Sequence, residues 1–465
     1  MEPRKRRTLW VLWIATSLVL GIVLAAWLQG QANRRFFLPG PTSHGHHQVE
    51  LACGACHGNP FGGGEVIQDA CINCHGKELK TSKDAHPKSK FTDPRNADRI
   101  KNLDATLCVT CHVEHRPEIT LKMQLTRPVD YCVSCHRDIA EHRPSHQGMA
   151  FNTCADAGCH NFHDNRALYE DFLLKHAHEP WLRDPRELPP RELLDWFITT
   201  TGTVPNPLSQ AEADQPREVK ANGALLHDWA SSTHARAGVN CSGCHQAKAA
   251  GNTATWVDKP SYKACQGCHE PEAKGFLAGK HGMRLVQNLS PMQLAMARIP
   301  MRQDAAHREL SCTSCHGAHR FDTRFAAADA CLGCHADEHS LAFKQSPHGQ
   351  LWAHELKGEL TDGAGVSCSS CHMPRIQWDD GMYNTRTAVE HNQNDTLRPN
   401  EKMIRPVCLH CHGMEFAIDA LADPVLIRNN FEGRPGRHVK SIDMALRRLE
   451  EDRRRRQQGN VQTGE

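Results

Sequence analysis

The chain has 465 residues, 39% of them hydrophobic and 6% aromatic, and its formal net charge is +2. This length normally gives two to four domains, each with an aliphatic core. The 22 cysteines and 32 histidines far exceed ordinary usage and argue against an interior filled mainly by aliphatic side chains.

The N-terminal residues predict a membrane anchor. Residues 1–7 are basic, and residues 8–28 are almost free of polar side chains and long enough to cross a bilayer as a helix. Because a basic flank stays in the cytoplasm, we expect a single-pass protein of the bacterial inner membrane with its bulk in the periplasm. Residues 29–43 form a linker. The alternative is a signal peptide cleaved after Ala32, although the apolar run exceeds the usual length of a signal core.

The cysteines follow one repeated pattern. All 22 fall into eleven pairs, and a histidine follows the second cysteine of every pair. If both thiols add to the vinyl groups of one haem and the adjacent imidazole binds its iron, the three residues must recur together. The pattern predicts about eleven covalent haems c, at Cys53, Cys56, His57; Cys71, Cys74, His75; Cys108, Cys111, His112; Cys132, Cys135, His136; Cys154, Cys159, His160; Cys241, Cys244, His245; Cys265, Cys268, His269; Cys312, Cys315, His316; Cys331, Cys334, His335; Cys368, Cys371, His372; and Cys408, Cys411, His412.

Two other uses of cysteine compete with haem attachment. A disulfide framework gives no reason for a histidine after each second cysteine, and neither do zinc knuckles built from two CxxC pairs. Ten of the eleven pairs have the CxxCH form. Cys154 and Cys159 are separated by four residues, so a local disulfide stays the alternative for that pair.

The motifs divide the chain into two haem modules. Residues 44–165 hold five motifs and residues 226–415 hold six. Between them, residues 166–225 form a connector, with amphipathic helices expected from Ala167 and Arg191 and a loop over 201–216. In the tail, residues 416–465, the spacing of Ile442, Ala445, Leu446 and Leu449 predicts an amphipathic helix beside arginine clusters.

The expected fold is mainly α with much irregular structure, and packed porphyrins take the place of the usual core. Strands are not expected, because alternating β-branched residues are nearly absent.

The remaining 21 histidines can supply a second ligand to every iron. Three of them follow a motif histidine at the spacing CHxxH, which lets one short turn serve two haems. Ligation by two histidines leaves no open coordination position, so most haems should be low-potential electron carriers. The candidate distal ligands are His47, His86, His115, His146, His163, His234, His281, His307, His319, His339, His348 and His391.

Two resemblances follow from these motifs. The first half, with GHHQVELACGACH, ACINCH, CVTCHVEH and YCVSCH, resembles small low-potential multihaem cytochromes with bis-histidine haems. The second half, with STHARAGVNCSGCH, SCTSCHGAH and GVSCSSCHMPR, is similar to the pentahaem nitrite reductase and octahaem hydroxylamine oxidoreductase superfamily. That resemblance implies that His391, beyond the CHMP segment, ligates a haem. The CxxCK motif of ammonia-forming nitrite reductases is absent, and Tyr383 only lies in the neighbourhood of a cross-linking tyrosine.

The leading functional hypothesis is an electron-transfer protein that takes electrons from a quinol-oxidising membrane donor and passes them to periplasmic acceptors, with no nucleic-acid partner. The alternative is an oxidoreductase that acts on a small nitrogen or sulfur compound at one five-coordinate haem in the second half. A structural subunit of a larger complex is a third possibility. The number of irons with two protein ligands distinguishes a carrier from an enzyme.

Overall fold

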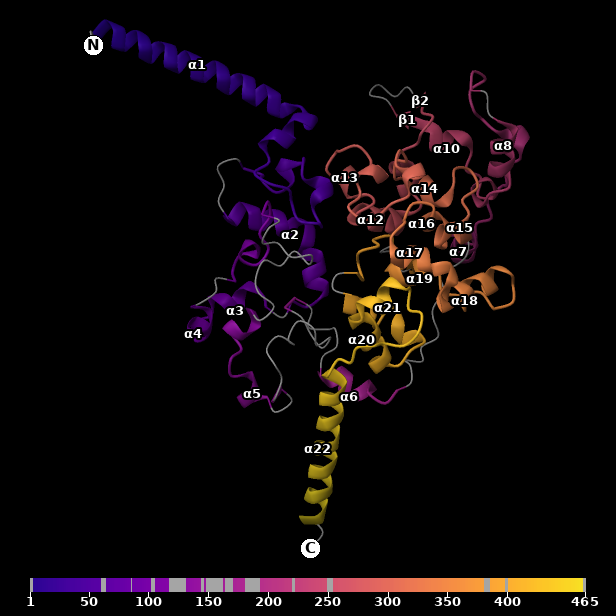
Figure 1. Ribbon diagram of the computed structural model, residues 1–465. Coiled ribbons are helices and arrows are strands. Elements are labelled where there is room, and N and C mark those ends of the chain that lie inside the picture. The colour runs from indigo at the N-terminus through magenta and orange to yellow at the C-terminus, as the bar shows by residue number, and fades with distance from the viewer. Residues whose placement is uncertain are drawn as a thin grey trace. The chain divides into compact units, whose positions relative to one another are not determined.

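The computed structural model (Figure 1) describes residues 3–59, 64–84, 86–101, 105–116, 131–143, 146–147, 162–163, 170–179, 193–219, 222–248, 254–379, 385–397 and 400–462. Cys154, Cys159, His160 and Tyr383 lie outside these ranges. The chain forms two compact units. Unit 1 comprises Met1–Gly76 and Leu103–Pro128, and unit 2 comprises Lys77–Asn102 and Val129–Glu465. The limits of the two haem modules stay a prediction.

The described chain is mainly helical, with much irregular structure between short helices (Figure 1). Its first helices are α1 (Pro3–Gln29), α2 (Gly64–Thr81), α3 (Lys88–Thr92), α4 (Ala97–Ile100), α5 (Ile139–His142), α6 (Glu170–His176) and α7 (Leu193–Thr201). The later ones are α8 (Gly223–Ala230), α9 (Thr233–Arg236), α10 (Cys241–His245), α11 (Tyr262–Gln266), α12 (Glu270–Ala278), α13 (Met283–Val286), α14 (Cys312–His316), α15 (Thr323–Ala327), α16 (Asp329–Leu332), α17 (Glu338–Ala342), α18 (Pro347–Leu356), α19 (Cys368–His372), α20 (Met414–Ala422), α21 (Pro424–Arg428) and α22 (Ser441–Gln462).

Helix α1 contains the one span among the described residues that is long and apolar enough to cross a membrane, over Lys5–Leu28. None of this span is buried against the rest of the chain. Its apolar side chains, such as Leu18 and Ile22, face outward. This helix suits a membrane anchor or a signal sequence.

Most of the described haem motifs fold as single α or 3-10 turns, and the motif that begins at Cys71 lies within the longer helix α2. In the motif that begins at Cys53, the amide of His57 donates a 2.8 Å hydrogen bond to the carbonyl of Cys53, and the same bond of 2.9 Å joins His412 to Cys408. Residues three and four apart lie on one side of a helical turn. The turn therefore presents both sulfur atoms and the imidazole in the same direction.

Two short antiparallel hairpins contradict the expectation that strands are absent. Strand β1 (Gln246–Lys248) pairs with β2 (Ala254–Trp256), and β3 (Arg375–Asp379) pairs with β4 (Thr385–Val389). Strand β4 alternates β-branched residues over only five positions, and its centre is buried. Such a short alternation is easily missed in a sequence rich in turns. The hairpin matters because His391 follows β4 directly.

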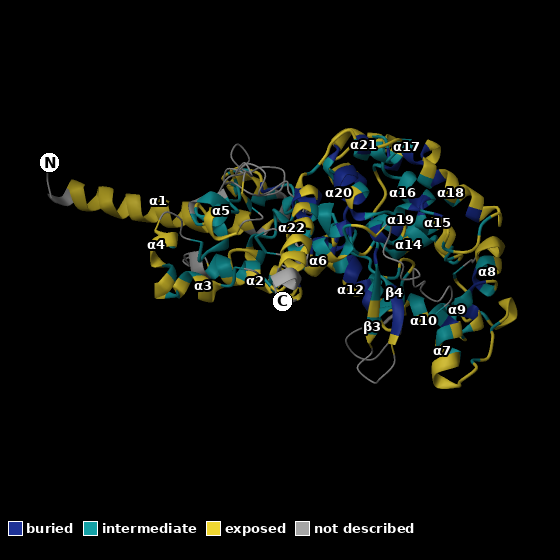
Figure 2. Ribbon diagram, turned by 90° about the horizontal axis from the view of Figure 1, so that it is seen from below, coloured by how far each residue is buried: buried dark blue, intermediate teal, exposed yellow. Residues whose placement is uncertain are grey.

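Unit 2 has an aliphatic core near the C-terminus. Leu409, Ile418 and Ile442 are at most 3% exposed, and they pack together with α6, α20 and the start of α22. Helices α6 and α22 contact each other, and Figure 2 shows buried residues gathered in α20. The helix predicted in the tail thus docks through Ile442 and Ala445, while its arginine-rich end is exposed.

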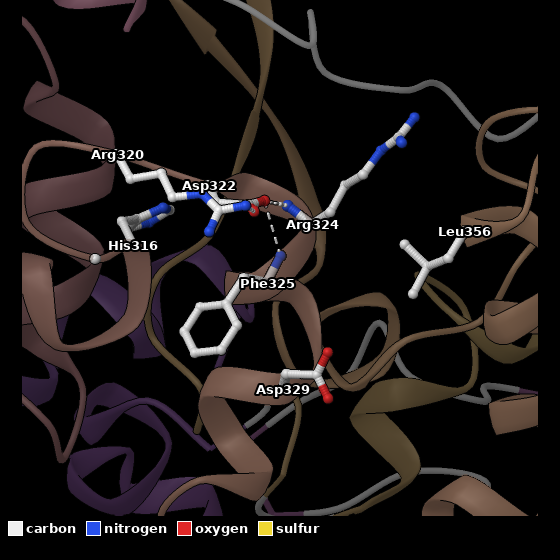
Figure 3. A pocket seen from close by; sticks show the side chains of 8 residues that line it. His316, Arg320, Asp322, Arg324, Phe325, Asp329 and Leu356 are labelled. Atoms are coloured by element: carbon white, nitrogen blue, oxygen red, sulfur yellow. Dashed lines mark hydrogen bonds and ion pairs between the residues drawn. The ribbon is translucent and has the colours of Figure 1, made fainter. Parts of the chain in front are cut away.

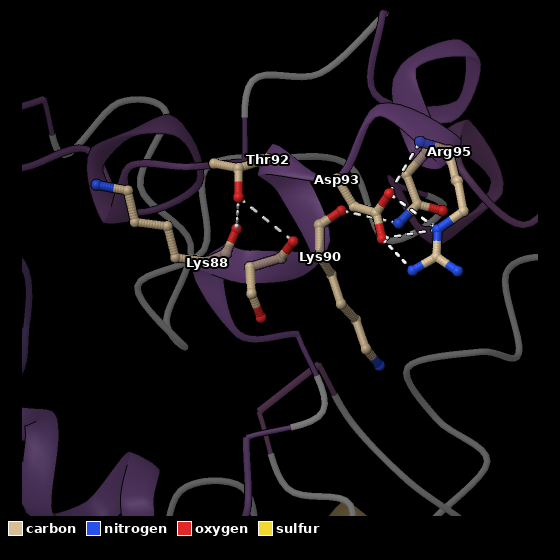
Figure 4. Close-up of polar contacts among 7 residues, drawn as sticks. Lys88, Lys90, Thr92, Asp93 and Arg95 are labelled. Atoms are coloured by element: carbon tan, nitrogen blue, oxygen red, sulfur yellow. Dashed lines mark hydrogen bonds and ion pairs between the residues drawn. The ribbon is translucent and has the colours of Figure 1, made fainter.

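Smaller polar contacts shape the segment that contains α3. Asp93 accepts hydrogen bonds from the amide of Arg95, at 2.9 Å, and from its guanidinium, at 2.6 Å (Figure 4). Asp93 therefore caps the short 3-10 helix Pro94–Asn96 that leads into α4.

Candidate haem sites

In the second predicted haem module, residues 226–415, every motif histidine faces a histidine from a distant part of the chain. The distances between ring centroids lie between 5.8 and 6.3 Å. The pairs are His245 with His319, His269 with His234, His335 with His281, His316 with His391, His372 with His339, and His412 with His348.

The first half contains three such facing pairs among its described residues. In unit 1, the ring of His57 lies 6.4 Å from that of His115, and the ring of His75 lies 5.9 Å from that of His46. In unit 2, His136 lies 6.1 Å from His86.

These separations match the space that one iron requires between two imidazoles. A metal–imidazole bond is about 2.0 Å and the ring centroid lies about 1.1 Å further on, so two rings on opposite sides of one iron have centroids about 6.2 Å apart. Packed aromatic rings can have similar separations, about 4.5–7 Å, so the identification of iron sites also depends on the regular pairing of each motif histidine with a second histidine. The nine facing pairs are therefore suited to hold an iron between them.

Hydrogen bonds at the other ring nitrogen leave Nε2 available for a metal. The Nδ1 atom of His86 donates to the carbonyl of Phe162 at 2.7 Å, that of His115 to Gly40 at 2.8 Å, and that of His391 to Val389 at 2.8 Å. A carbonyl acceptor fixes the tautomer and the ring orientation, as at other histidine–metal sites.

The His46 ring has a different acceptor. Its Nδ1 lies 2.6 Å from the carboxylate of Glu114, which also accepts hydrogen bonds of 2.6 Å from the amide and the hydroxyl of Ser43. Burial raises the pKa of Glu114, but the hydrogen bonds from His46 and Ser43 outweigh it and lower that pKa to about 2.

Burial favours the neutral imidazole that ligation requires. It lowers the pKa of His281, His316 and His372 to about 4. It also lowers the pKa of His234 and His391. A neutral ring offers a lone pair to a metal, whereas an imidazolium does not.

A cavity of about 480 Å³ opens beside one of these pairs, next to His316. Figure 3 shows the side chains of Arg320 and Arg324 around it, with Phe325 and Leu356 supplying apolar surface. Apolar walls suit a porphyrin face, and guanidinium groups suit its propionates. Asp322 and Asp329 also line the cavity, and Asp322 lies 3.4 Å from Arg320. The lining therefore suits a porphyrin face better than it suits the propionates.

The cysteines are arranged for attachment rather than for disulfides. All the cysteines within the described residues are free thiols. In the haem-loaded protein, each of these sulfur atoms would be the thioether sulfur that joins a cysteine to its haem.

The comparisons with known proteins bear on the first half of the chain. Residues 45–137 match the model of the cytochrome c3 family. The chain is a multihaem c-type cytochrome. Its CxxC pairs bind haem c, and the family match implies a role in electron transfer. No curated protein and no solved structure matches the chain.

Most of the predicted distal histidines of this cytochrome lie opposite a motif histidine, but four are placed otherwise. The His47 ring lies 5.8 Å from that of His44, and His46 faces His75 in its place. His307 is exposed. His146 and His163 are partly buried, and Nδ1 of His163 lies 3.4 Å from Asp84. The ligands opposite His112 and His160 stay predictions.

The sequence does not single out His46, because His44, His46 and His47 all precede the first motif within a few residues. Only the fold decides which of these rings reaches His75. A usable signal lies further along the chain: Glu114, inside CHVEH, can pair with a histidine.

Backbone geometry holds two of the predicted distal histidines in place. His115 and His319, the second histidines of CHVEH and CHGAH, both have positive φ, at 61° and 67°. This conformation is costly for a residue other than glycine and marks a site that its surroundings determine. A Cβ at Gly40 would collide with the carbonyl of His115.

His391 is held by a similar close approach. A Cβ at Gly275, in α12, would lie 2.7 Å from the His391 backbone nitrogen. Strand β4 is fixed to the same helix because the buried Arg386 guanidinium lies 2.8 Å from the Glu272 carboxylate. Helix α12 therefore sets the position of the ring opposite His316.

Proposed function

We propose that this protein is a membrane-anchored periplasmic electron carrier with about eleven haems c. The observation that carries the proposal is the set of facing histidine pairs at the spacing of one iron. Each motif histidine is the proximal ligand, and the facing histidine is the distal ligand. We name each haem below by its motif histidine.

The same pairs favour a carrier over an enzyme. A catalytic haem must keep one coordination position free for its substrate. The enzymatic alternative places that haem in the second half, where each of the six motif histidines faces a second histidine. Six bis-histidine haems would carry electrons without binding a substrate.

Contacts between motifs support a continuous electron path in the second half. Two pairs of thiols from successive motifs form hydrogen bonds, Cys265 with Cys312 and Cys331 with Cys368. Three further pairs influence each other only through charge. Each of the five pairs joins one motif to the next along the sequence. They are Cys244 with Cys265, Cys265 with Cys312, Cys315 with Cys331, Cys331 with Cys368, and Cys371 with Cys408.

Such a series brings successive porphyrin edges close together, because each thioether sulfur is attached to the edge of its haem. Electrons would then move in sequence order between the His245 haem and the His412 haem. In unit 1, Cys56 with Cys74 and Cys71 with Cys108 form a shorter series of the same kind.

The N-terminal helix supports the proposed location. As an uncleaved anchor, α1 would keep the haems beside a quinol-oxidising donor of the inner membrane, from which electrons pass to periplasmic acceptors. Deletion of residues 1–28, with a cleavable signal supplied, should release soluble protein with all its haems. A native N-terminus at Asn33 would show instead that the helix is removed.

The carrier proposal is tested by ligand binding to the reduced protein. The haem-loaded full-length chain should have a low-spin spectrum, and carbon monoxide, nitrite and hydroxylamine should leave the six second-half haems unchanged. Intact mass should exceed that of the polypeptide by eleven haems. Ten haems would return Cys154 and Cys159 to the disulfide interpretation, and turnover of nitrite or hydroxylamine at a high-spin haem would favour the enzyme.

A further inference from the structure

The segment from His112 to His115 reaches three haem sites in unit 1. His112 belongs to its own motif, and the ring of His115 lies 6.4 Å from that of His57. Between them, Glu114 lies 2.6 Å from Nδ1 of His46, the ring that faces His75. Glu114 thus acts on the His75 haem only through His46.

The nitrogen that does not face the iron has three kinds of surroundings in the described pairs. At His86, His115 and His391 the acceptor is a neutral carbonyl. At His234 and His319 the Nδ1 atom is buried, with no hydrogen-bond partner in the described part of the chain. At His46 the acceptor is a carboxylate at 2.6 Å; the Asp337 carboxylate near Nδ1 of the motif histidine His335 is further away, at 3.7 Å.

A carboxylate that accepts the Nδ1 hydrogen bond changes the basicity of the histidine that binds the iron. Glu114 accepts three hydrogen bonds, two of them from Ser43, and these favour its charged form. An anion that accepts the Nδ1 proton increases the basicity of Nε2, and a more basic ligand stabilises Fe(III) over Fe(II). On reduction one electron enters the iron, the proton stays between Nδ1 and the carboxylate, and no bond between heavy atoms breaks.

We propose that Glu114 is a positioning residue that gives the His75 haem the lowest potential among the haems with described histidine pairs. The inference rests on the proposed function, because it requires His46 to be the distal ligand of that haem. It adds an ordering of potentials to the electron path: the His75 haem would be the last of this set to be reduced and the first to give up its electron.

The test is Glu114→Gln in the haem-loaded, full-length protein. Glutamine keeps an oxygen acceptor for His46 but removes the charge, so the site becomes like those with a carbonyl. We expect about a tenfold shift of one Fe(III)/Fe(II) equilibrium toward Fe(II), or about 59 mV upward for one electron, in a potentiometric titration. The haem count should not change, the haem should stay low-spin, and the near-infrared charge-transfer band of one haem should shift.

Two further variants serve as controls. Glu359→Gln removes a carboxylate that pairs with Nδ1 of His354, a half-exposed histidine that faces no motif histidine among the described residues. It should leave every potential unchanged. Glu114→Asp keeps the charge and should leave the His75 haem closer to the native potential than Glu114→Gln does.

His46→Ala separates this inference from the proposed function. A new high-spin haem in His46→Ala, together with unchanged potentials in Glu114→Gln, would overturn the role of Glu114 and leave the carrier proposal standing. An entirely low-spin His46→Ala protein would show that His46 is not a ligand, and the role of Glu114 would fall with it. A high-spin haem in Glu114→Gln itself would show that Glu114 only holds the ring in place, which also overturns the inference.

Discussion

The region that matches the cytochrome c3 family and the C-terminal region of unit 2 have different interiors. Among the described residues, every buried hydrophobic side chain lies at or after Leu173, whereas Gln48 and Ser82 are the buried residues of 45–137. In Figure 2, α3 and α4 carry no buried colour, while α20 does. The first region therefore depends on haem for its interior, and the second has a core of its own polypeptide.

The strongest test of this contrast removes all haem. If the full-length chain is made in a host without haem-attachment machinery, residues 45–137 should lose their structure, because little apolar surface is buried there. Helices α20 and α22 should keep theirs, since burial of Ile418 and Ile442 contributes about 1.5–3 kcal/mol per side chain. By hydrogen exchange, amides of α20 should be protected at least about 100-fold more than those of 45–137. Equal exchange in both regions would contradict the contrast.

Substitution of one predicted iron ligand in the C-terminal region of unit 2 gives a more local test. His391→Ala should convert one low-spin haem to high-spin and create one site for carbon monoxide, without loss of covalent haem, because its ring lies 6.1 Å from His316. His307→Ala is the matched control, since His307 is exposed. It should leave the spectrum unchanged. An unchanged spectrum in His391→Ala would remove this residue as a ligand, and with it the resemblance to the nitrite reductase and hydroxylamine oxidoreductase superfamily.

A substitution one step away from the iron should have a smaller effect. Gly275→Ala places a methyl group against the Glu390 carboxylate and 2.7 Å from the backbone nitrogen of His391, so it should shift the His391 ring and give a partial high-spin population. Gly223→Ala, at the start of α8, meets nothing within 4 Å and is the control. Magnetic circular dichroism of the oxidised protein would measure both. If Gly275→Ala proves fully low-spin, the contact is flexible enough to absorb a Cβ.

The haem motifs can be predicted from sequence because their chemistry is local. Cysteines and histidine within one helical turn identify attachment, and the same short-range logic predicts helices near Ala167 and Arg191, where the structure has α6 and α7. The apolar run of α1 is also local. None of these predictions requires knowledge of how distant segments meet.

The choice of distal ligands depends on contacts that the sequence does not encode locally. His234 stands just before the motif of His245, yet it faces His269. His46 and His47 are neighbours, and only the position of Glu114 distinguishes them. The β3–β4 hairpin was missed for a related reason, because Arg386 and Glu272 hold it from a distant helix.

The smallest expected effect concerns the docking of α22 in the C-terminal region. His438 lies between Asp419, 3.1 Å from Nδ1, and Asp443, 3.0 Å from Nε2, and Glu415 lies nearby. Hydrogen bonds to Asp443 and Asp419 raise the pKa of His438 to about 9. Because this pKa exceeds that of an unfolded histidine, about 6.5, the interaction stabilises the fold fully below pH 6.5 and is lost as the pH rises through about 9.

Substitution of His438 by glutamine should therefore weaken the docking of α22 at pH 6 and have little effect at pH 10. The side chain is 45% exposed, so solvent screening limits the loss to about 1 kcal/mol or less. Hydrogen exchange of the first turns of α22, corrected for the intrinsic rate at each pH, would measure it. His354→Gln, at a half-exposed histidine in α18, is the control. Equal destabilisation at both pH values would mean that His438 acts through packing rather than charge.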